Sequence, residues 1–72
     1  MKKNPITELR QFLGVSQEQL AELLDTSQGQ ISYWESDTRA MLATTALHIW
    51  SKFRKPLRGL GFDLEDLLRV GR

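Results

Sequence analysis

Residues 14–36 read GVSQEQLAELLDTSQGQISYWES, and this stretch decides the fold. Two serines in it are each followed three positions later by a glutamine: Ser16 with Gln19, and Ser27 with Gln30. In a capping box of this pattern, the serine and glutamine side chains each bond the backbone N–H of the other residue at the start of a helix. The stretch therefore predicts two short helices, each beginning directly after its serine.

The two predicted helices meet at Asp25-Thr26, which leaves room only for a tight turn. Aspartate tolerates the left-handed backbone conformation of such a turn better than most residues other than glycine and asparagine. Two short helices joined in this way form a helix-turn-helix, which we expect to span residues 16–36.

The spacing of apolar residues separates an inward and an outward side on each predicted helix. We expect the first helix to bury Leu20, Ala21, Leu23 and Leu24, and the second to bury Ile31 and Trp34. The outward side of the second helix then carries polar, nearly uncharged groups: Gln28, Gly29, Ser32 and Tyr33. Such groups suit base edges, since glutamine can bond adenine at N6 and N7, and serine or tyrosine can reach a base, a methyl group or a phosphate.

The rest of the chain adds three more predicted helices. Asn4-Pro5 is typical of a cap followed by proline at the first helical position, and that helix should end at Gly14. A fourth helix is expected at roughly residues 43–53, with Ala46, Ile49, Trp50 and Phe53 on one face. Residues 54–61, RKPLRGLG, predict a loop or broken turn, after which Asp63 can cap a short last helix. The predicted fold is all-α, a compact bundle of five short helices.

The 72 residues allow one domain, which we expect to cover residues 1–72, with residues 54–72 as a C-terminal extension used for dimerisation. The chain has no cysteine, so it can form neither a disulfide nor a thiolate metal site, and we expect it in the cytoplasm. No apolar stretch is long enough to span a membrane. A single histidine, His48, has no neighbouring cluster of metal-binding or catalytic type, so we expect no metal, no cofactor, no small-molecule effector and no enzyme activity.

The sequence resembles the lambda-repressor and Cro-like (XRE-type) helix-turn-helix regulators. The likeness rests on SQ-x-x-LA at residues 16–21, Ser-Gln at residues 27–28, the run Ile31-x-x-Trp34-Glu35, and Arg10 in the first helix. It implies a structural pair between Arg10 and Glu35. It further implies base contacts from Gln28, Gly29 and Tyr33, with Gln30 and Ser32 nearby, and phosphate contacts from Gln17, Ser27 and Arg39. Asp25 and Asp37 depart from the family pattern, because both replace a glycine.

The resemblance implies that the chain binds double-stranded DNA sequence-specifically and regulates transcription as a repressor. The net charge is only +1, so one module neutralises few phosphates, and we expect a homodimer on a palindromic operator. The expected subunit contact consists of Trp50, Leu57, Leu60 and Phe62, although these residues could instead fill the core of one chain. The alternative is an antitoxin-like module that binds a toxin-like partner protein, with or without DNA. Arg54, Lys55 and Arg58 are either phosphate contacts or a solvated basic turn.

Overall fold

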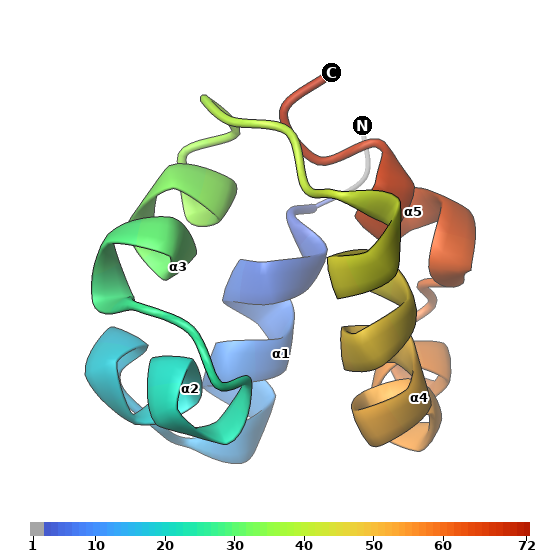
Figure 1. The fold of residues 1–72 in the computed structure, drawn as a ribbon. Helices are drawn as coiled ribbons and strands as arrows, with labels where there is room; N and C mark the ends of the chain where they lie inside the picture. The colour runs from blue at the N-terminus through green and yellow to red at the C-terminus, as the bar shows by residue number, and fades with distance from the viewer. Residues whose placement is uncertain (1–2) are drawn as a thin grey trace.

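The computed structural model describes residues 3–72, so the first two residues of the expected domain lie outside the described part. Within the described residues the structure has five helices: α1 (Pro5–Leu13), α2 (Gln17–Leu23), α3 (Gln28–Glu35), α4 (Ala43–Gly59) and α5 (Leu64–Leu68). In Figure 1, α2 and α3 lie on one side of α1, and α4 and α5 lie on the other. The all-α prediction is confirmed.

The helix starts follow from capping side chains. Asn4 Oδ1 accepts the backbone N–H groups of Ile6 and Thr7, at 2.9 and 3.1 Å, and so caps α1. Ser16 and Gln19 form the reciprocal capping box that the sequence predicts for α2. These bonds satisfy N–H groups that would otherwise lack an acceptor in the first helical turn.

The second predicted capping box, at α3, is only half formed. Ser27 Oγ accepts the backbone N–H of Gln30 at 3.3 Å, as predicted. The side chain of Gln30 does not return the bond to Ser27. Its Oε1 is buried, and within residues 3–72 it has no hydrogen-bond partner. The capping prediction therefore needs correction here, because the Gln30 side chain lies partly in the interior.

Both aspartates that stand in place of glycines adopt a left-handed backbone. Asp25, between α2 and α3, has φ 57°, and Asp37, after α3, has φ 62°. A short polar side chain makes this conformation accessible to a residue other than glycine. The two turns therefore form without glycine, as the sequence predicts.

The core lies where all five helices meet. Its fully buried large side chains are Ile6, Leu9, Leu20, Ile31, Met41, Ile49, Leu57 and Leu67. Trp34 joins them with only 3% of its surface exposed, which confirms its predicted inward position beside Ile31. Leu23 was expected in the core but is 39% exposed, because it lies at the edge of the helix face whose residues Leu20, Ala21 and Leu24 are buried.

Helix α4 runs further than the sequence predicts, since residues 54–59 are helical and not a loop. The helix kinks at Phe53, whose φ and ψ are −124° and 30°. Pro56 lies in the first turn after this kink, where a backbone N–H has no helical acceptor to lose. From the sequence, Pro56 was expected to interrupt the helix. The kink at Phe53 allows the helix to continue through this proline.

The longer helix also corrects the expected subunit contact. Leu57 is fully buried and Phe62 is 6% exposed, so both fill the core of a single chain and are unavailable to a second one. Trp50 and Leu60 are partly buried and pack against that core.

Within residues 3–72 no helix combines the length and apolar character that crossing a bilayer requires.

Candidate nucleic-acid interface

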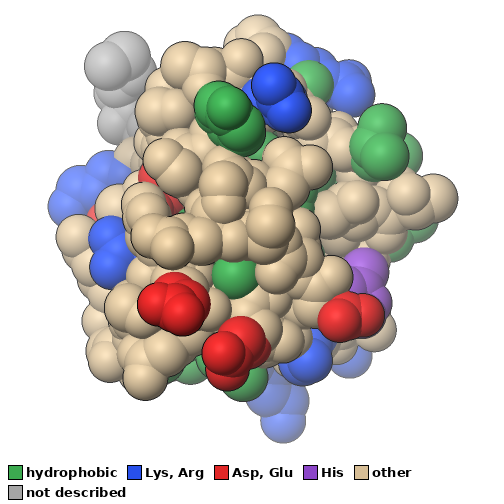
Figure 2. Space-filling model, turned by 60° about the vertical axis from the view of Figure 1, so that its left-hand side comes forward, with side chains coloured by type: hydrophobic (Ala, Val, Ile, Leu, Met, Phe, Trp, Pro, Cys, Tyr) green, Lys and Arg blue, Asp and Glu red, His purple; other side chains and the backbone are tan. Residues whose placement is uncertain are grey.

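The outward side of α3 is a continuous polar surface. Gln28, Gly29, Ser32 and Tyr33 are all exposed, and the Tyr33 side chain shows 44% of its surface. Figure 2 shows this side of the molecule as mostly uncharged. The buried residues Ile31 and Trp34 pack the inner side of α3 into the core, so the exposed groups lie on a helix that is anchored from its other side.

Gln30 differs from these four residues, although the sequence groups it with them. It is half-buried, and it lines a hollow together with Trp34, Thr44 and His48. The structure therefore places Gln30 between α3 and the start of α4, while the other four residues face outward.

Behind the exposed surface, one carboxylate joins three helices. Glu35 ends α3, and its Oε1 accepts Nε of Arg10 in α1 at 2.8 Å. Its Oε2 accepts Nε2 of Gln17, the first residue of α2, at 2.5 Å. Arg10 also donates from Nη1 to the carbonyl of Val15, at 3.3 Å. The expected Arg10–Glu35 pair is present, and its side chains are only 25% and 10% exposed.

The sequence does not predict the third member of this network. Gln17 was expected to contact phosphate, but its side-chain amide is bonded to Glu35. The backbone N–H of Gln17 belongs to the first turn of α2, where N–H groups have no helical acceptor and can face an anion. In this structure, therefore, the Gln17 side chain supports the fold.

The network also lowers the pKa of Glu35. Burial alone raises the pKa, but hydrogen bonds from Arg10 and Gln17, the charge of Arg10 and the Thr7 hydroxyl together outweigh it, so the pKa lies below its ordinary value of 4.5. A carboxyl group whose pKa is lowered by folding stabilises the protein above its unfolded pKa, and that stability is lost as the pH falls through the folded pKa.

We therefore expect Glu35→Gln to reduce the acid dependence of folding. The wild-type protein should lose stability as the pH falls below about 4.5, the ordinary pKa of glutamate, and the variant should lose less over the same window. Urea unfolding at a series of pH values measures this difference. Parallel curves for the two proteins would show that Glu35 does not contribute.

Tyr33 and Arg39, expected to contact a base and a phosphate respectively, lie against each other. The Arg39 guanidinium stands over the Tyr33 ring, 4.2 Å from its centroid. A cation at this distance is attracted by the face of the ring. The sequence does not reveal this stack, because six positions and the end of α3 separate the two residues.

The charges around this surface are unevenly placed. Glu18 and Glu22 are exposed on α2, Asp25 follows them, and Figure 2 shows acidic side chains gathered below the uncharged area. The basic Lys52 is bonded elsewhere, since its Nζ donates to the carbonyl of Leu23 at 2.5 Å. Arg39, in contrast, is a cation that lies against the exposed face of α3.

Comparison with known protein families gives a match over most of the chain. A family model described as a helix-turn-helix domain matches residues 5–70, which contain all five helices. No curated protein and no solved structure matches the chain. Among residues 3–72, no group of three histidine, cysteine, aspartate or glutamate side chains is placed to hold a metal ion.

Proposed function

Because the chain belongs to the helix-turn-helix domain family, we propose that it reads duplex DNA sequence-specifically with α3 and represses transcription. The observation that carries the proposal is the exposed polar side of α3, held rigidly by its buried side and by the Glu35 network. Such a helix fits the major groove, where its hydrogen-bonding groups can meet base edges.

Each exposed residue of α3 has a proposed part. Gln28 and Ser32 lie four positions apart, on one side of the helix, and Tyr33 follows Ser32 toward its end. Gly29 leaves the helix backbone open between them. A Cβ at this position would meet nothing nearer than Ser27 Oγ, at 3.8 Å, so internal packing does not require glycine there. Gly29 supports the proposal because close approach of a backbone to a ligand is a common reason for glycine.

Phosphate contacts are proposed on both sides of this helix. Ser27 is exposed at its start, and Arg39 stands beside Tyr33 near its end. Gln17 is proposed to meet phosphate through the N–H groups at the start of α2, since its side chain is bonded to Glu35. Contacts of this kind fix the register of the protein on DNA but carry no base information.

A homodimer on a palindromic operator is the proposed form that binds. With net charge +1 and acidic residues near α2, one module has a weak electrostatic attraction to DNA, and two half-sites compensate for it. Trp50 and Leu60 remain the proposed subunit contacts, because both are partly exposed beside the core.

A second candidate is an antitoxin-like module that holds a toxin-like partner protein. Leu42 and Leu47, at the start of α4, are 71% and 52% exposed and favour a protein contact there.

We propose no catalytic role, since the helix-turn-helix family is typically non-enzymatic. The proposal places the protein in the cytoplasm because its duplex target would lie there.

Selection from random duplexes, followed by footprinting, tests sequence-specific binding directly. On the selected duplex we expect Gln28→Ala to weaken binding about 10- to 100-fold and to relax the preference at one base pair, since a bidentate contact to adenine is lost. Gln17→Ala keeps the backbone N–H groups at the start of α2, so it should leave the sequence preference unchanged and weaken binding less than Gln28→Ala does.

Gln11→Ala provides the matched control, because Gln11 is an exposed glutamine on α1 and should leave binding unchanged. All three variants are measured well below their melting temperatures, because Gln17 also supports Glu35. A selection that returns no preferred sequence with the wild-type protein would contradict the proposed function.

A further inference from the structure

The loop between α3 and α4 begins with a set of hydrogen bonds to one carbonyl group. The Tyr33 carbonyl accepts the backbone N–H of Thr38 at 3.1 Å, Ser36 Oγ at 3.1 Å and Thr38 Oγ1 at 3.3 Å. The two hydroxyl oxygens also lie 2.8 Å apart, so that one hydroxyl proton is shared between the other hydroxyl and the carbonyl. The first half of the loop is therefore fixed to the residue whose ring is proposed to contact a base.

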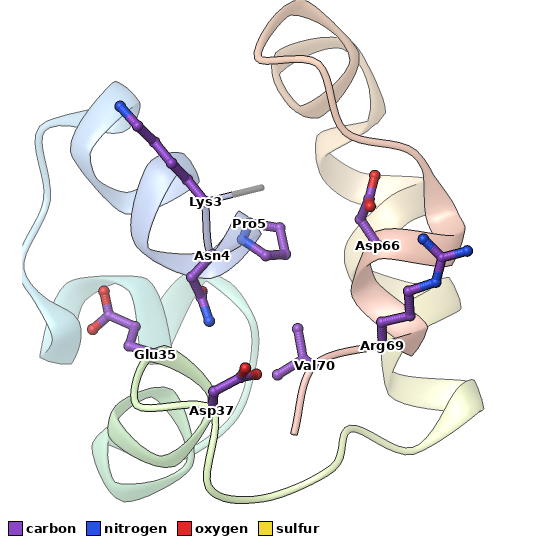
Figure 3. Close-up of a pocket in the computed structure, with 8 residues that line it drawn as sticks. All are labelled: Lys3, Asn4, Pro5, Glu35, Asp37, Asp66, Arg69 and Val70. Carbon is purple, nitrogen blue, oxygen red and sulfur yellow. The ribbon is translucent and has the colours of Figure 1, made fainter. Parts of the chain in front are cut away.

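The same loop is also held by residues 69–72, which follow α5 and are called the C-terminal tail below. Gly71 donates its backbone N–H to Asp37 Oδ1 at 2.7 Å, and Val70 beside it is buried, with 3% exposed. In Figure 1 the tail passes close to this loop, and Figure 3 shows Asp37 directed toward Val70 from the end of α3.

The tail lies so close to the loop that only glycine fits at residue 71. A Cβ there would stand 2.3 Å from the Arg39 carbonyl carbon, 2.4 Å from its oxygen and 2.5 Å from Ala40 N. The φ of Gly71 is also +75°, a conformation that favours glycine. Two independent features, the hydrogen bond to Asp37 and the close approach to Arg39, therefore seat the tail on the loop.

The loop residue against which Gly71 packs is the one that reaches the exposed face of α3. The backbone of Arg39 touches the tail, while its guanidinium stands over the Tyr33 ring at 4.2 Å. Contacts thus continue from the tail through Arg39 to Tyr33.

We propose that the C-terminal tail is a positioning element of the DNA-reading surface, in which the Asp37–Gly71 contact holds Arg39 against Tyr33. Neither Asp37 nor Gly71 needs to touch DNA for this effect. With the contact in place, Arg39 is ordered before DNA arrives. Without it, the loop and its long side chain are ordered only on binding, which weakens affinity. This inference rests on the proposed function.

Two variants, Asp37→Gly and Asp37→Asn, distinguish the effect of losing the hydrogen bond to Gly71 from the effect of losing the negative charge of Asp37. Both variants remove one negative charge, and both residues accept a positive φ. Asparagine retains an Oδ1 that can accept the Gly71 N–H, whereas glycine does not. We expect Asp37→Gly to bind the selected duplex about three- to tenfold more weakly than Asp37→Asn, and its amide hydrogens at residues 36–41 to exchange faster in the free protein.

Asp25→Gly is the matched control, since Asp25 has a similar φ of 57° but lies in the turn between α2 and α3, away from the tail. It should bind DNA at least as tightly as the wild-type protein, because only a negative charge is lost. Gly71→Ala provides a second disruption of the same contact and should reproduce the weaker binding of Asp37→Gly.

The possible outcomes distinguish this inference from the proposed function. Equal DNA affinity of Asp37→Gly and Asp37→Asn would overturn the positioning role, even with faster exchange in the loop, and would leave the proposed function intact. Unchanged exchange in Asp37→Gly would also overturn it, because the contact would then not order the loop. A wild-type protein without a preferred duplex would refute the proposed function itself, and the inference with it.

Discussion

Arg10→Met should lower the melting temperature by about 10 to 20 °C. Removing the guanidinium leaves the Glu35 carboxylate, which is only 10% exposed, without its cation. Its remaining partner is the neutral side-chain amide of Gln17. Breaking a buried pair in this way costs about 3 to 5 kcal/mol, and we expect about 2 to 3 here because the Arg10 side chain is 25% exposed. In a domain of this size, 1 kcal/mol shifts the melting temperature by about 4 to 8 °C. Thermal unfolding followed by circular dichroism measures the shift.

The chain contains a matched control for this prediction. Arg69 pairs with Glu65 at 3.3 Å on the surface of α5, with side chains 70% and 72% exposed. Arg69→Met should therefore shift the melting temperature by only a few degrees. The double variant Arg10→Met with Glu35→Gln should recover part of the loss, because it no longer leaves an unpaired carboxylate. Equal shifts for Arg10→Met and Arg69→Met would contradict a structural role for the Glu35 network.

Moving the two half-sites of the selected operator apart by five base pairs should reduce affinity at least about a hundredfold. Recognition helices of a dimer enter successive major grooves about 34 Å apart, so half a helical turn of extra DNA puts the second half-site on the opposite face. The protein then binds with one subunit, and the gain from linked binding is lost. Titration of both duplexes, with sedimentation to count subunits, measures the effect.

A duplex with a single half-site is the control and should bind as weakly as the respaced operator. Undiminished affinity at the altered spacing, or one chain per palindrome by sedimentation, would rule out the dimer. Those results would favour the partner-binding candidate, in which Leu42 and Leu47 contact another protein.

Features set by neighbouring residues were predictable from the sequence. The Asn4 and Ser16 caps, the buried Ile31–Trp34 pair and the left-handed turn at Asp25 each depend on residues a few positions apart. Such local patterns fix where helices begin and which side faces inward. They were sufficient to locate the exposed face of α3.

Features set by contacts across the fold were not predictable in this way. Pro56 was expected to end the helix, but the chain kinks at Phe53 and the helix continues through Leu57, which is fully buried in the core. The contact of Gly71 with Asp37 joins residues 34 positions apart. Nothing in the sequence around Gly71 indicates that this glycine contacts the loop between α3 and α4.

The cap of α1 restricts which residue can stand at position 4. Its Oδ1 accepts N–H groups of α1, and the Nδ2 of the same side chain donates to the Trp34 carbonyl at 2.8 Å. Aspartate has no donor to replace Nδ2, and the hydroxyl of serine or threonine offers a single oxygen that cannot face both groups. Residues that are interchangeable as caps on an isolated helix are therefore not interchangeable here, and natural variation or redesign of this chain should retain asparagine at position 4.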